Sequence, residues 1–315
     1  MTVPDCNNDF SPIRPIALRW VITALFAVLL SGCPLFDRDD PVDFLSNPIS
    51  RAFAGRLTYP TGEGPFYILA GDLTRNGLPD IVTLNWTSGT LSVLRAAGDS
   101  GYAEAIDYDV GATPRAAALA DLSGNGVLDI VVVNEDQSQA TLLFGDGAGG
   151  FHGSTLIPLA AGTAPRDVIA ADLNSDGIMD IAVATTQAGT VTIIPGEGGG
   201  NFLEPFIAPA GHKPWSLCAA DFSGNGVPDI ITANPETNTL SLLEGTGGGY
   251  LPARYLPCGN MPSLIRTADL NRDGQPDLII GNAGSGDISA LLGLGGGAFS
   301  DERRFAFPYP AGRFV

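Results

Sequence analysis

Short apolar runs of β-forming residues, separated by turns rich in glycine, proline and aspartate, recur along most of this chain. In the third copy of the pattern the runs cover residues 165–171, 180–184, 190–195 and 202–208. Runs of this length between turn-forming residues are typical of β-strands. A unit of four strands and about 50 residues, repeated along a chain, predicts the blades of a β-propeller. Such a sheet buries its apolar faces only when it is stacked against its neighbours.

An aspartate-rich loop joins the first and second run of every unit. The first aspartates of the five copies are 49, 51, 49 and 48 residues apart, which is the signature of a repeat array rather than of an ordinary globular core. Every copy has Asp at positions 1 and 9, Gly at position 6, Ser, Thr or Asn at position 3, and Asn or Asp at position 5. The five loops occupy residues 72–80, 121–129, 172–180, 221–229 and 269–277.

The side chains of these loops predict a site for a hard cation. Ca²⁺ takes six to eight oxygen ligands, and a glycine at position 6 permits the sharp turn that brings them together. An EF-hand would need a Glu at position 12 and helices on both sides, whereas β-forming residues follow each loop here. We therefore predict Ca²⁺ as the cofactor. The predicted ligands are Asp72, Thr74, Asn76, Asp80, Asp121, Ser123, Asn125, Asp129, Asp172, Asn174, Asp176, Asp180, Asp221, Ser223, Asn225, Asp229, Asp269, Asn271, Asp273 and Asp277.

An alternative is that these residues recur for backbone reasons, because Asx and Gly are also good turn formers. Turn geometry alone makes no obvious demand for Asp at positions 1 and 9, so the cation is the favoured interpretation. The third and fifth loops carry three aspartates each and should bind most tightly. Arg75 in the first loop and Arg272 in the fifth should weaken those two sites.

The amino-terminal region has the layout of a secretory signal. An apolar stretch over residues 21–30 follows Arg14 and Arg19 and is too short to span a bilayer. It ends in the sequence Leu-Ser-Gly-Cys, which resembles the lipobox of bacterial lipoproteins and so implies cleavage before Cys33 and lipidation of its thiol. An ordinary secretory signal with a coincidental cysteine is the alternative.

These features divide the chain into three parts. We expect a signal peptide over residues 1–32, a flexible acidic and proline-containing tether over residues 33–50, and the propeller over residues 51–315. The chain should therefore be an extracytoplasmic lipoprotein of a bacterium, on the cell surface or in the periplasm. It would meet the membrane only through its lipid anchor.

Charge and cysteine content restrict the partners and the chemistry. The chain has 34 acidic and 16 basic residues, a net charge of −18, which argues against nucleic acid or anionic lipid as a partner. Cys218 and Cys258 fall near opposite ends of equivalent strands in neighbouring units. Their Cα atoms should then lie far beyond the roughly 7 Å limit of a disulfide, so we predict two buried free thiols.

The repeated motifs resemble the FG-GAP or VCBS repeats of integrin α-subunit propellers and of many bacterial surface proteins. The resemblance covers roughly residues 53–310. It rests on the Asp-x-Asn-x-Asp-Gly-x-x-Asp loop, a Gly-x-x-Pro connector before each first strand, and a Gly-x-Gly-x-x-Phe turn, present with one extra residue at residues 196–202. It implies that calcium binds where the first and second strands of each blade join. Integrins close a seven-bladed ring, whereas this chain shows five loops.

The number of outer strands bears on how such a ring closes. Phe53 stands nine residues before Gly62, the interval that separates other outer strands from the following connector, and the last unit has an outer candidate of its own at residues 299–307. The chain thus holds one outer strand more than five blades require. We expect a five-bladed ring whose closure pairs the amino-terminal strand with the last blade. An open arc completed by another subunit is the alternative, because exposed sheet edges invite pairing.

The face opposite the aspartate loops carries the more varied residues and is the predicted ligand-binding face. Aromatic side chains beside polar groups can hold a glycan or a protein segment. Packing between blades, or the preference of Asn for turns, would also place such residues there. The candidates for ligand contact are Trp86, His212, Lys213 and Trp215, with Met261 and the strand-ending Asn85, Asn134, Asn234 and Asn282 on the same face.

No catalytic constellation can be recognised in the sequence. The two histidines occupy non-equivalent places in their units, and neither a Gly-x-Ser-x-Gly nor a His-Glu-x-x-His motif is present. We therefore predict a binding or adhesion module rather than an enzyme, with no catalytic residues. A polysaccharide hydrolase or lyase is the alternative, because acid–base catalysis needs only two well-placed carboxylates. Glu135 and Asp136, on the varied face, would be its first candidates.

Overall fold

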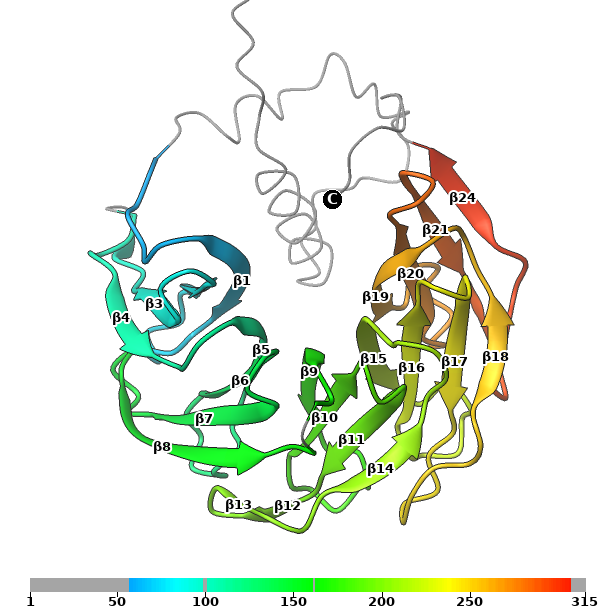
Figure 1. Cartoon of the computed structure of the whole chain (residues 1–315), viewed down its shortest axis with the longest axis horizontal. Helices are drawn as coiled ribbons and strands as arrows, with labels where there is room; N and C mark the ends of the chain where they lie inside the picture. The colour runs from blue at the N-terminus through cyan, green and yellow to red at the C-terminus, as the bar shows by residue number, and fades with distance from the viewer. Residues whose placement is uncertain (1–56, 99–100, 161, 307–315) are drawn as a thin grey trace, which may run out of the picture. The chain divides into compact units, whose positions relative to one another are not determined.

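The computed structural model describes residues 57–98, 101–160 and 162–306, and its regular secondary structure in these ranges is β-strand throughout. Five antiparallel sheets of four strands follow one another around a common centre, each with its strands in chain order from the inside outwards (Figure 1). The protein is a five-bladed β-propeller, as the repeat predicted. The predicted signal peptide, the tether and Cys33 lie outside the described residues. No helix in the described ranges has the length and apolarity needed to cross a membrane.

Four of the five blades begin at the proline of their connector, and blade 4 begins two residues after it. Blade 1 consists of β1 (Pro65–Gly71), β2 (Asp80–Asn85), β3 (Thr90–Leu94) and β4 (Ile106–Asp109). Blade 2 consists of β5 (Pro114–Ala120), β6 (Asp129–Asn134), β7 (Gln139–Gly145) and β8 (Phe151–Pro158). Blade 3 consists of β9 (Pro165–Ala171), β10 (Asp180–Thr185), β11 (Thr190–Ile194) and β14 (Phe206–Pro209).

The last two blades repeat this plan. Blade 4 consists of β15 (Ser216–Ala220), β16 (Asp229–Asn234), β17 (Thr239–Leu243) and β18 (Arg254–Pro257). Blade 5 consists of β19 (Pro262–Ala268), β20 (Asp277–Asn282), β21 (Asp287–Leu291) and β24 (Arg303–Ala306). Short two-stranded hairpins formed by β12 (Gly196–Gly198) with β13 (Asn201–Phe202), and by β22 (Gly293–Gly295) with β23 (Ala298–Phe299), extend blades 3 and 5.

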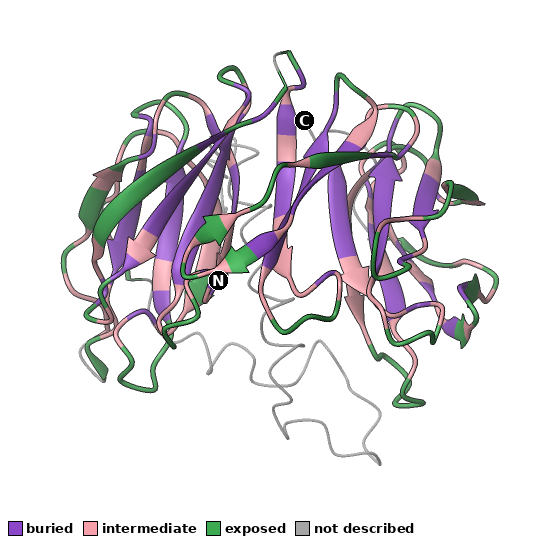
Figure 2. Ribbon diagram, turned by 90° about the horizontal axis from the view of Figure 1, so that it is seen from below, coloured by how far each residue is buried: buried purple, intermediate pink, exposed green. Residues whose placement is uncertain are grey.

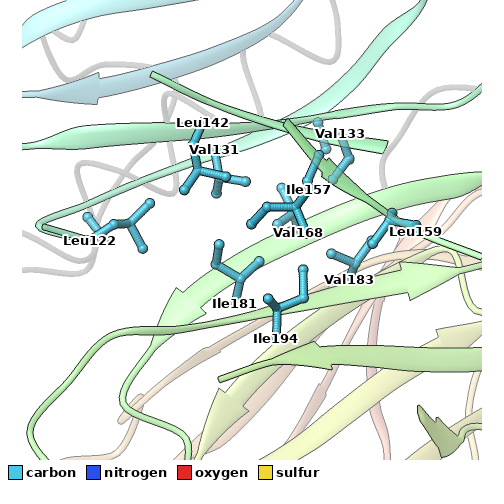
Figure 3. Close-up of a cluster of buried hydrophobic side chains, with 13 residues drawn as sticks. Leu122, Val131, Val133, Leu142, Ile157, Leu159, Val168, Ile181, Val183 and Ile194 are labelled. Carbon is cyan, nitrogen blue, oxygen red and sulfur yellow. The ribbon is translucent and has the colours of Figure 1, made fainter. Parts of the chain in front are cut away.

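Hydrophobic clusters between successive blades form the core. The second strands of blades 2 to 4 are buried along their whole length, so the residues between their first and last positions are mostly apolar (Figure 2). The cluster between blades 2 and 3 joins Val131, Val133 and Leu142 of one blade to Val168 and Ile181 of the next (Figure 3). Comparable clusters join blades 1 and 2, 3 and 4, and 4 and 5. In the described ranges, four clusters therefore couple the five blades.

The predicted outer segment of the third unit differs from the structure. A single run was expected over residues 202–208, but Phe202 belongs to the hairpin strand β13 and the outer strand β14 starts only at Phe206. Pro205 lies between them, and a proline cannot donate the backbone hydrogen bond that a continuous strand would need. The first strand of this unit matches the prediction from Pro165 to Ala171.

Blade 5 obtains its outer strand from its own residues. β24 pairs with β21 from Arg303 to Ala306, within the segment that the sequence offered as an outer candidate. Blade 1 likewise carries its own outer strand, β4. The amino-terminal strand at Phe53, which was expected to complete the last blade, lies outside the described residues.

The residue before each connector proline adopts a left-handed backbone conformation in every blade. Its φ angle is 69° at Gly64, 52° at Thr113, 48° at Ala164, 49° at Lys213 and 51° at Met261. In four blades the carbonyl of this residue accepts a hydrogen bond from the residue after the second strand, as in the 2.9 Å contact between Trp86 N and Gly64 O. Because the conformation recurs in all five units, it is a requirement of the fold rather than strain confined to one site.

Candidate metal centre

The aspartate at position 1 organises the backbone of its own loop. In the first loop Asp72 Oδ1 accepts a hydrogen bond from Asn76 N at 3.0 Å, and Oδ2 accepts one from Gly77 N at 2.8 Å. The same two contacts recur in the other four loops. The φ angle at position 6 lies between 80° and 87°, a conformation that glycine adopts freely, which explains its presence in every copy.

The side chain at position 5 closes a smaller turn within each loop. Asn76 Oδ1 accepts a hydrogen bond from Leu78 N at 2.8 Å, and the residues at position 5 of the other loops make the same contact. This Asx turn uses one side-chain oxygen of Asn or Asp equally well. The backbone conformation therefore does not determine whether Asn or Asp occupies position 5. The difference in charge between the two side chains can instead affect how strongly the loop binds a cation.

The aspartate at position 9 is buried and holds two distant parts of its blade together. Asp229 is fully buried, and its Oδ2 accepts a hydrogen bond from Ser223 N at 2.7 Å while Oδ1 accepts one from Gly245 N at 2.8 Å. Its counterparts in the other four blades are equally buried. In each of them one oxygen accepts from the loop and the other from the residue 16 positions further on.

These contacts correct one premise of the sequence analysis. Turn geometry does call for Asp at positions 1 and 9, because each carboxylate accepts hydrogen bonds from two backbone amides, and those at position 9 include buried amides that would otherwise lack a partner. A neutral or shorter side chain could not accept both hydrogen bonds. The invariance of these two aspartates therefore has a structural explanation, and support for a cation comes from other features of the loops.

The hydroxyl group at position 3 is one such feature. Ser123 Oγ in the second loop is buried and has no hydrogen-bond partner. In the fourth loop Ser223 Oγ lies 3.4 Å from both Asp221 Oδ1 and Asp229 Oδ1, so the side chains of positions 1, 3 and 9 converge there. A buried polar atom without a partner is costly, and an ion bound among these oxygens would satisfy it.

The third loop concentrates negative charge. Burial, together with the nearby carboxylates Asp176 and Asp172, raises the pKa of Asp180 above its usual value, although Gly196 and Leu173 donate hydrogen bonds to it. Its fourth residue is Ser175, whereas the first and fifth loops carry an arginine there. Three carboxylates without a neighbouring cation repel one another, and a divalent ion would remove that repulsion.

The donor set of each loop is mixed. Among the described residues, no group of three or more Asp, Glu, His or Cys side chains is arranged on its own to hold a metal ion. Each loop instead offers two or three carboxylates beside the amide or hydroxyl oxygens of positions 3 and 5. Such a set of carboxylate and neutral oxygens is the kind that Ca²⁺ accepts, so the residues present fit that ion.

The loops also contact the next blade. The glycine-rich turn of blade 2 donates a hydrogen bond from Gly149 N to Leu73 O in the first loop at 3.2 Å. The turn of blade 5 does the same from Gly297 N to Phe222 O in the fourth loop at 2.8 Å. Ordering of a loop by an ion would therefore stiffen a joint between blades as well as the loop itself.

Two aromatic and arginine clusters lie at the opposite edge of the blades. Between blades 1 and 2 the guanidinium of Arg115 lies 5.0 Å from the ring centre of Phe66 and 5.9 Å from that of Trp86, whose side chain is exposed. Between blades 3 and 4 the guanidinium of Arg166 lies 3.8 Å from the ring centre of Trp215. Both clusters bridge neighbouring blades, so they fix the orientation of the aromatic rings.

The other candidates of this edge do not form one pocket. Lys213 forms an ion pair of 2.5 Å with Glu236, and both side chains are exposed, as is His212. Glu135, a candidate of the enzyme alternative, pairs with Arg115 at 3.3 Å. Asp136 donates its backbone N–H to Thr113 Oγ1 at 3.2 Å. A hollow of about 600 Å³ beside Trp86 is lined by residues 86–89, 109 and 111–113.

The four strand-ending asparagines are structural. Asn234 is fully buried, and its Nδ2 donates hydrogen bonds to Ser241 Oγ at 2.6 Å and to Thr239 Oγ1 at 3.3 Å. Asn85 and Asn282 make equivalent contacts, while Asn134 donates to two backbone carbonyls. Their place at the ends of the second strands was predicted, but burial removes them from any ligand-binding surface.

Both described cysteines are free thiols, as predicted. Cys218 is buried, and burial raises its pKa to about 12. Cys258 is only half-buried, which differs from the prediction, and burial raises its pKa to about 12 as well. At neutral pH both thiols are protonated, so neither has the low pKa expected of a reactive cysteine.

A polar network along the inner strands was not anticipated from the sequence. Asp167 Oδ2 on β9 accepts hydrogen bonds from Ser216 Oγ on β15 at 2.7 Å and from Leu217 N at 3.1 Å. Arg266 on β19 lies 3.7 Å from the same oxygen, so the network links blades 3, 4 and 5. Asp167 and Ser216 occupy the same position in neighbouring units, five residues before the first loop aspartate, and this register is the signal that could have revealed the contact.

Solved structures with similar folds have low sequence identity to this chain. BBS1N, solved in complex with ARL6DN, aligns with a TM-score of 0.52 at 12% identity over 79% of this chain and 70% of that chain. A functionally unknown protein from Desulfotomaculum acetoxidans DSM 771 gives a TM-score of 0.56 at 14% identity, over 78% and 71%. A Bacteroides fragilis NCTC 9343 protein provisionally named a 6-phosphogluconolactonase gives 0.59 at 15% identity, over 78% and 71%. At these identities the likeness concerns the fold alone.

Sequence comparison identifies the repeat family. No curated protein matches the chain significantly. The model of the FG-GAP-like repeat matches four overlapping segments, residues 72–132, 121–183, 172–232 and 221–280, each running from one aspartate loop beyond the next. Together they span most of the five blades described above. The chain therefore belongs to the FG-GAP-like repeat family.

Proposed function

We propose that this protein is a calcium-stabilised, lipid-anchored extracytoplasmic propeller that binds a protein or glycan ligand without transforming it. The observation that carries the calcium part is the third loop, which has three aspartates and no arginine, and where burial together with Asp176 and Asp172 raises the pKa of Asp180. The unpartnered Ser123 hydroxyl supports it independently. The ligand would bind at the edge opposite the loops, where Trp86 of blade 1 and His212, between blades 3 and 4, are exposed.

Calcium would contribute substantially to the stability of the fold. A site with a Kd of about 0.1 mM contributes roughly 1.4 kcal/mol in about 1 mM Ca²⁺. Five independent sites of this kind would approach the roughly 5–15 kcal/mol by which a typical domain is stable. Removal of Ca²⁺ should therefore lower the melting temperature markedly.

Thermal unfolding with and without a chelator tests this part of the proposal. The expected result is a large decrease in Tm on chelation, reversed by added Ca²⁺. Asp176→Ala should lower the Tm in Ca²⁺ more than Asn76→Ala does, because both remove the same Asx turn but only the first removes a charge. In chelator the two variants should differ little. An unchanged Tm on chelation, together with no retained metal in the purified protein, would overturn the calcium proposal.

Attachment to the membrane rests on the lipobox-like sequence that ends at Cys33. Metabolic labelling with a radioactive fatty acid should mark the protein, and Cys33→Ser should abolish the label and release the chain from the membrane fraction. Labelling that persists in the Cys33→Ser variant would contradict the proposed anchor.

The ligand-binding edge can be tested with a glycan array and polysaccharide pull-down. Trp86→Ala should weaken retention of a bound polymer, because the exposed indole supplies a rigid apolar surface. Leu294→Ala is a matched control, since this residue is exposed in a glycine-rich turn at the loop edge. Retention without release of new reducing ends supports binding, whereas new reducing ends would favour the polysaccharide-active enzyme. The ion pair of Glu135 with Arg115 gives that enzyme no added support.

A further inference from the structure

The outer strand of blade 2 differs from the four strands that occupy the same place in the other blades. β4, β14, β18 and β24 have four residues each, whereas β8 has eight and pairs with β7 along its whole length. Residues 152–156 of β8 are all exposed. Blade 2 therefore ends in a long free edge with unpaired backbone groups (Figure 1).

The other outer strands carry features that discourage pairing at an edge. β4 contains Asp107 and Asp109, and β24 contains Arg303 and Arg304. β14 has only four residues and follows Pro205, and β18 contains Arg254. Charge, proline and short length are the usual means by which proteins prevent edge-to-edge association. β8 has no charged side chain apart from the titratable His152, and its one proline is the last residue.

A single register position makes the contrast explicit. The residue paired with Ser92 of blade 1 is Asp107, and the residue paired with Ser289 of blade 5 is Arg304. In blade 2 the equivalent residue, paired with Thr141, is Leu156, which is 60% exposed. An exposed leucine thus stands in the middle of the eight-residue edge, where blades 1 and 5 have a charge. Blades 3 and 4 have the exposed Ile207 and Tyr255 at this position, but on outer strands of only four residues.

The local absence of acidic residues allows a second copy to approach this edge. At a net charge of −18, two copies repel each other wherever their acidic surfaces meet. No Asp or Glu occurs between Asp146 and Asp167, a stretch that includes all of β8. Two identical strands that pair antiparallel are related by a two-fold axis, so β8 is complementary to itself without any further adaptation.

We propose that β8 pairs with β8 of a second copy to form a symmetric dimer, in which two blade-2 sheets become one continuous sheet. The contact is confined to one strand from each copy, so the dimer is weak and forms reversibly in the micromolar range or above. This association is independent of calcium and of the ligand-binding edge.

Sedimentation velocity of the full chain in detergent, over about 1–200 μM, tests the proposal. The expected result is a concentration-dependent dimer. Leu156→Asp introduces the residue that blade 1 has at this position and should weaken the dimer at least tenfold. Ile207→Asp is the matched control, because Ile207 is the equivalent residue of β14 and is 57% exposed. It should leave the dimer unchanged.

Hydrogen exchange provides a second readout that does not depend on a variant. The amides of residues 151–157 that do not bond to β7 should exchange more slowly in concentrated than in dilute protein, while those of β14 should not change. A chain that stays monomeric over the whole range would overturn the proposal. So would equal effects of the two substitutions, or a captured extended peptide of another protein on β8 without any self-association.

Discussion

The two edges of the blades are built from the same strands but differ in how far their residues repeat. At the loop edge the residues at positions 1, 6 and 9 are identical in all five blades, and their hydrogen bonds recur with them. At the opposite edge the residue after the second strand is Trp86, Glu135, Thr186, Pro235 or Ala283. The loop edge has the same residues at these three positions in every blade, whereas the opposite edge has a different residue after each second strand.

The difference separates what the fold needs from what a ligand would need. The loop edge must turn the chain sharply and satisfy buried amides in every blade, so its sequence has little freedom. At the opposite edge the buried asparagines carry the structural task, and the exposed residues beyond them are free to vary. An edge with this freedom is where binding residues accumulate on a rigid scaffold.

The largest effect on stability should come from the loop edge itself. Asp229→Ala removes a buried carboxylate and leaves Ser223 N and Gly245 N without an acceptor, which should cost about 3–5 kcal/mol. Urea denaturation in the presence of a chelator isolates this loss from any bound ion. Asp229→Asn keeps one oxygen acceptor and should cost clearly less. A loss below about 1 kcal/mol for Asp229→Ala would show that these hydrogen bonds do not hold the blade.

A smaller effect is expected from the structural asparagines of the opposite edge. Asn234→Ala breaks the contacts to Ser241 and Thr239 and should cost about 2 kcal/mol. The same loss should be measured with and without Ca²⁺, because Asn234 lies at the far end of its strand from the loop. If chelation removed the effect, the two edges would be coupled, and the separation drawn above would fail.

The smallest effect concerns pH at the opposite edge of blade 5. Burial alone would raise the pKa of Asp287, but hydrogen bonds from Asn282 and Ser285 and the nearby Arg304 bring it below its usual value. A lowered pKa in the folded state stabilises the protein above the ordinary Asp pKa of about 3.9. That contribution is lost as the pH falls below it.

Asp287→Ala should therefore cost about 1 kcal/mol at pH 7 and almost nothing at the lowest pH where the protein remains folded. Urea denaturation of the variant and the parent across this pH range measures the difference. Arg304→Ala is the informative companion variant. The ion pair is partly exposed, so this change should cost less than Asp287→Ala. A difference that grows at acid pH would contradict the assignment.

The sequence predicted the strands and the loops because both depend on local pattern. The apolar runs and the loop spacing placed β9 from Pro165 to Ala171 as observed. The outer strand of blade 3 was placed wrongly because the effect of Pro205 was overlooked. That effect is local, so the sequence was sufficient to predict it. The blade count and the repeat family followed from the same regularities.

Contacts between distant positions were harder to anticipate. The role of Asp229 depends on Gly245, which comes close only when the third strand returns along the second. The stacking of Arg166 on Trp215 joins residues 49 positions apart in neighbouring blades. The 16-residue offset from Asp229 to Gly245 recurs in all five blades, and the offset from Arg166 to Trp215 equals one repeat, so comparing the same register across all five units would have suggested the pairs. Burial of the asparagines depends on the neighbouring connector and could not be read from a single unit.

The four hydrophobic clusters that couple the five blades have a consequence for how the molecule comes apart. In a series of units held by nearest-neighbour contacts, those in the middle are secured from both sides, whereas the first and last rely on one described cluster each. The inner strand β1 and the strands β19 and β21 are accordingly less buried than their counterparts in blades 2 to 4. Judged by the described residues, blades 1 and 5 are the least secured, so opening should begin there and travel inward.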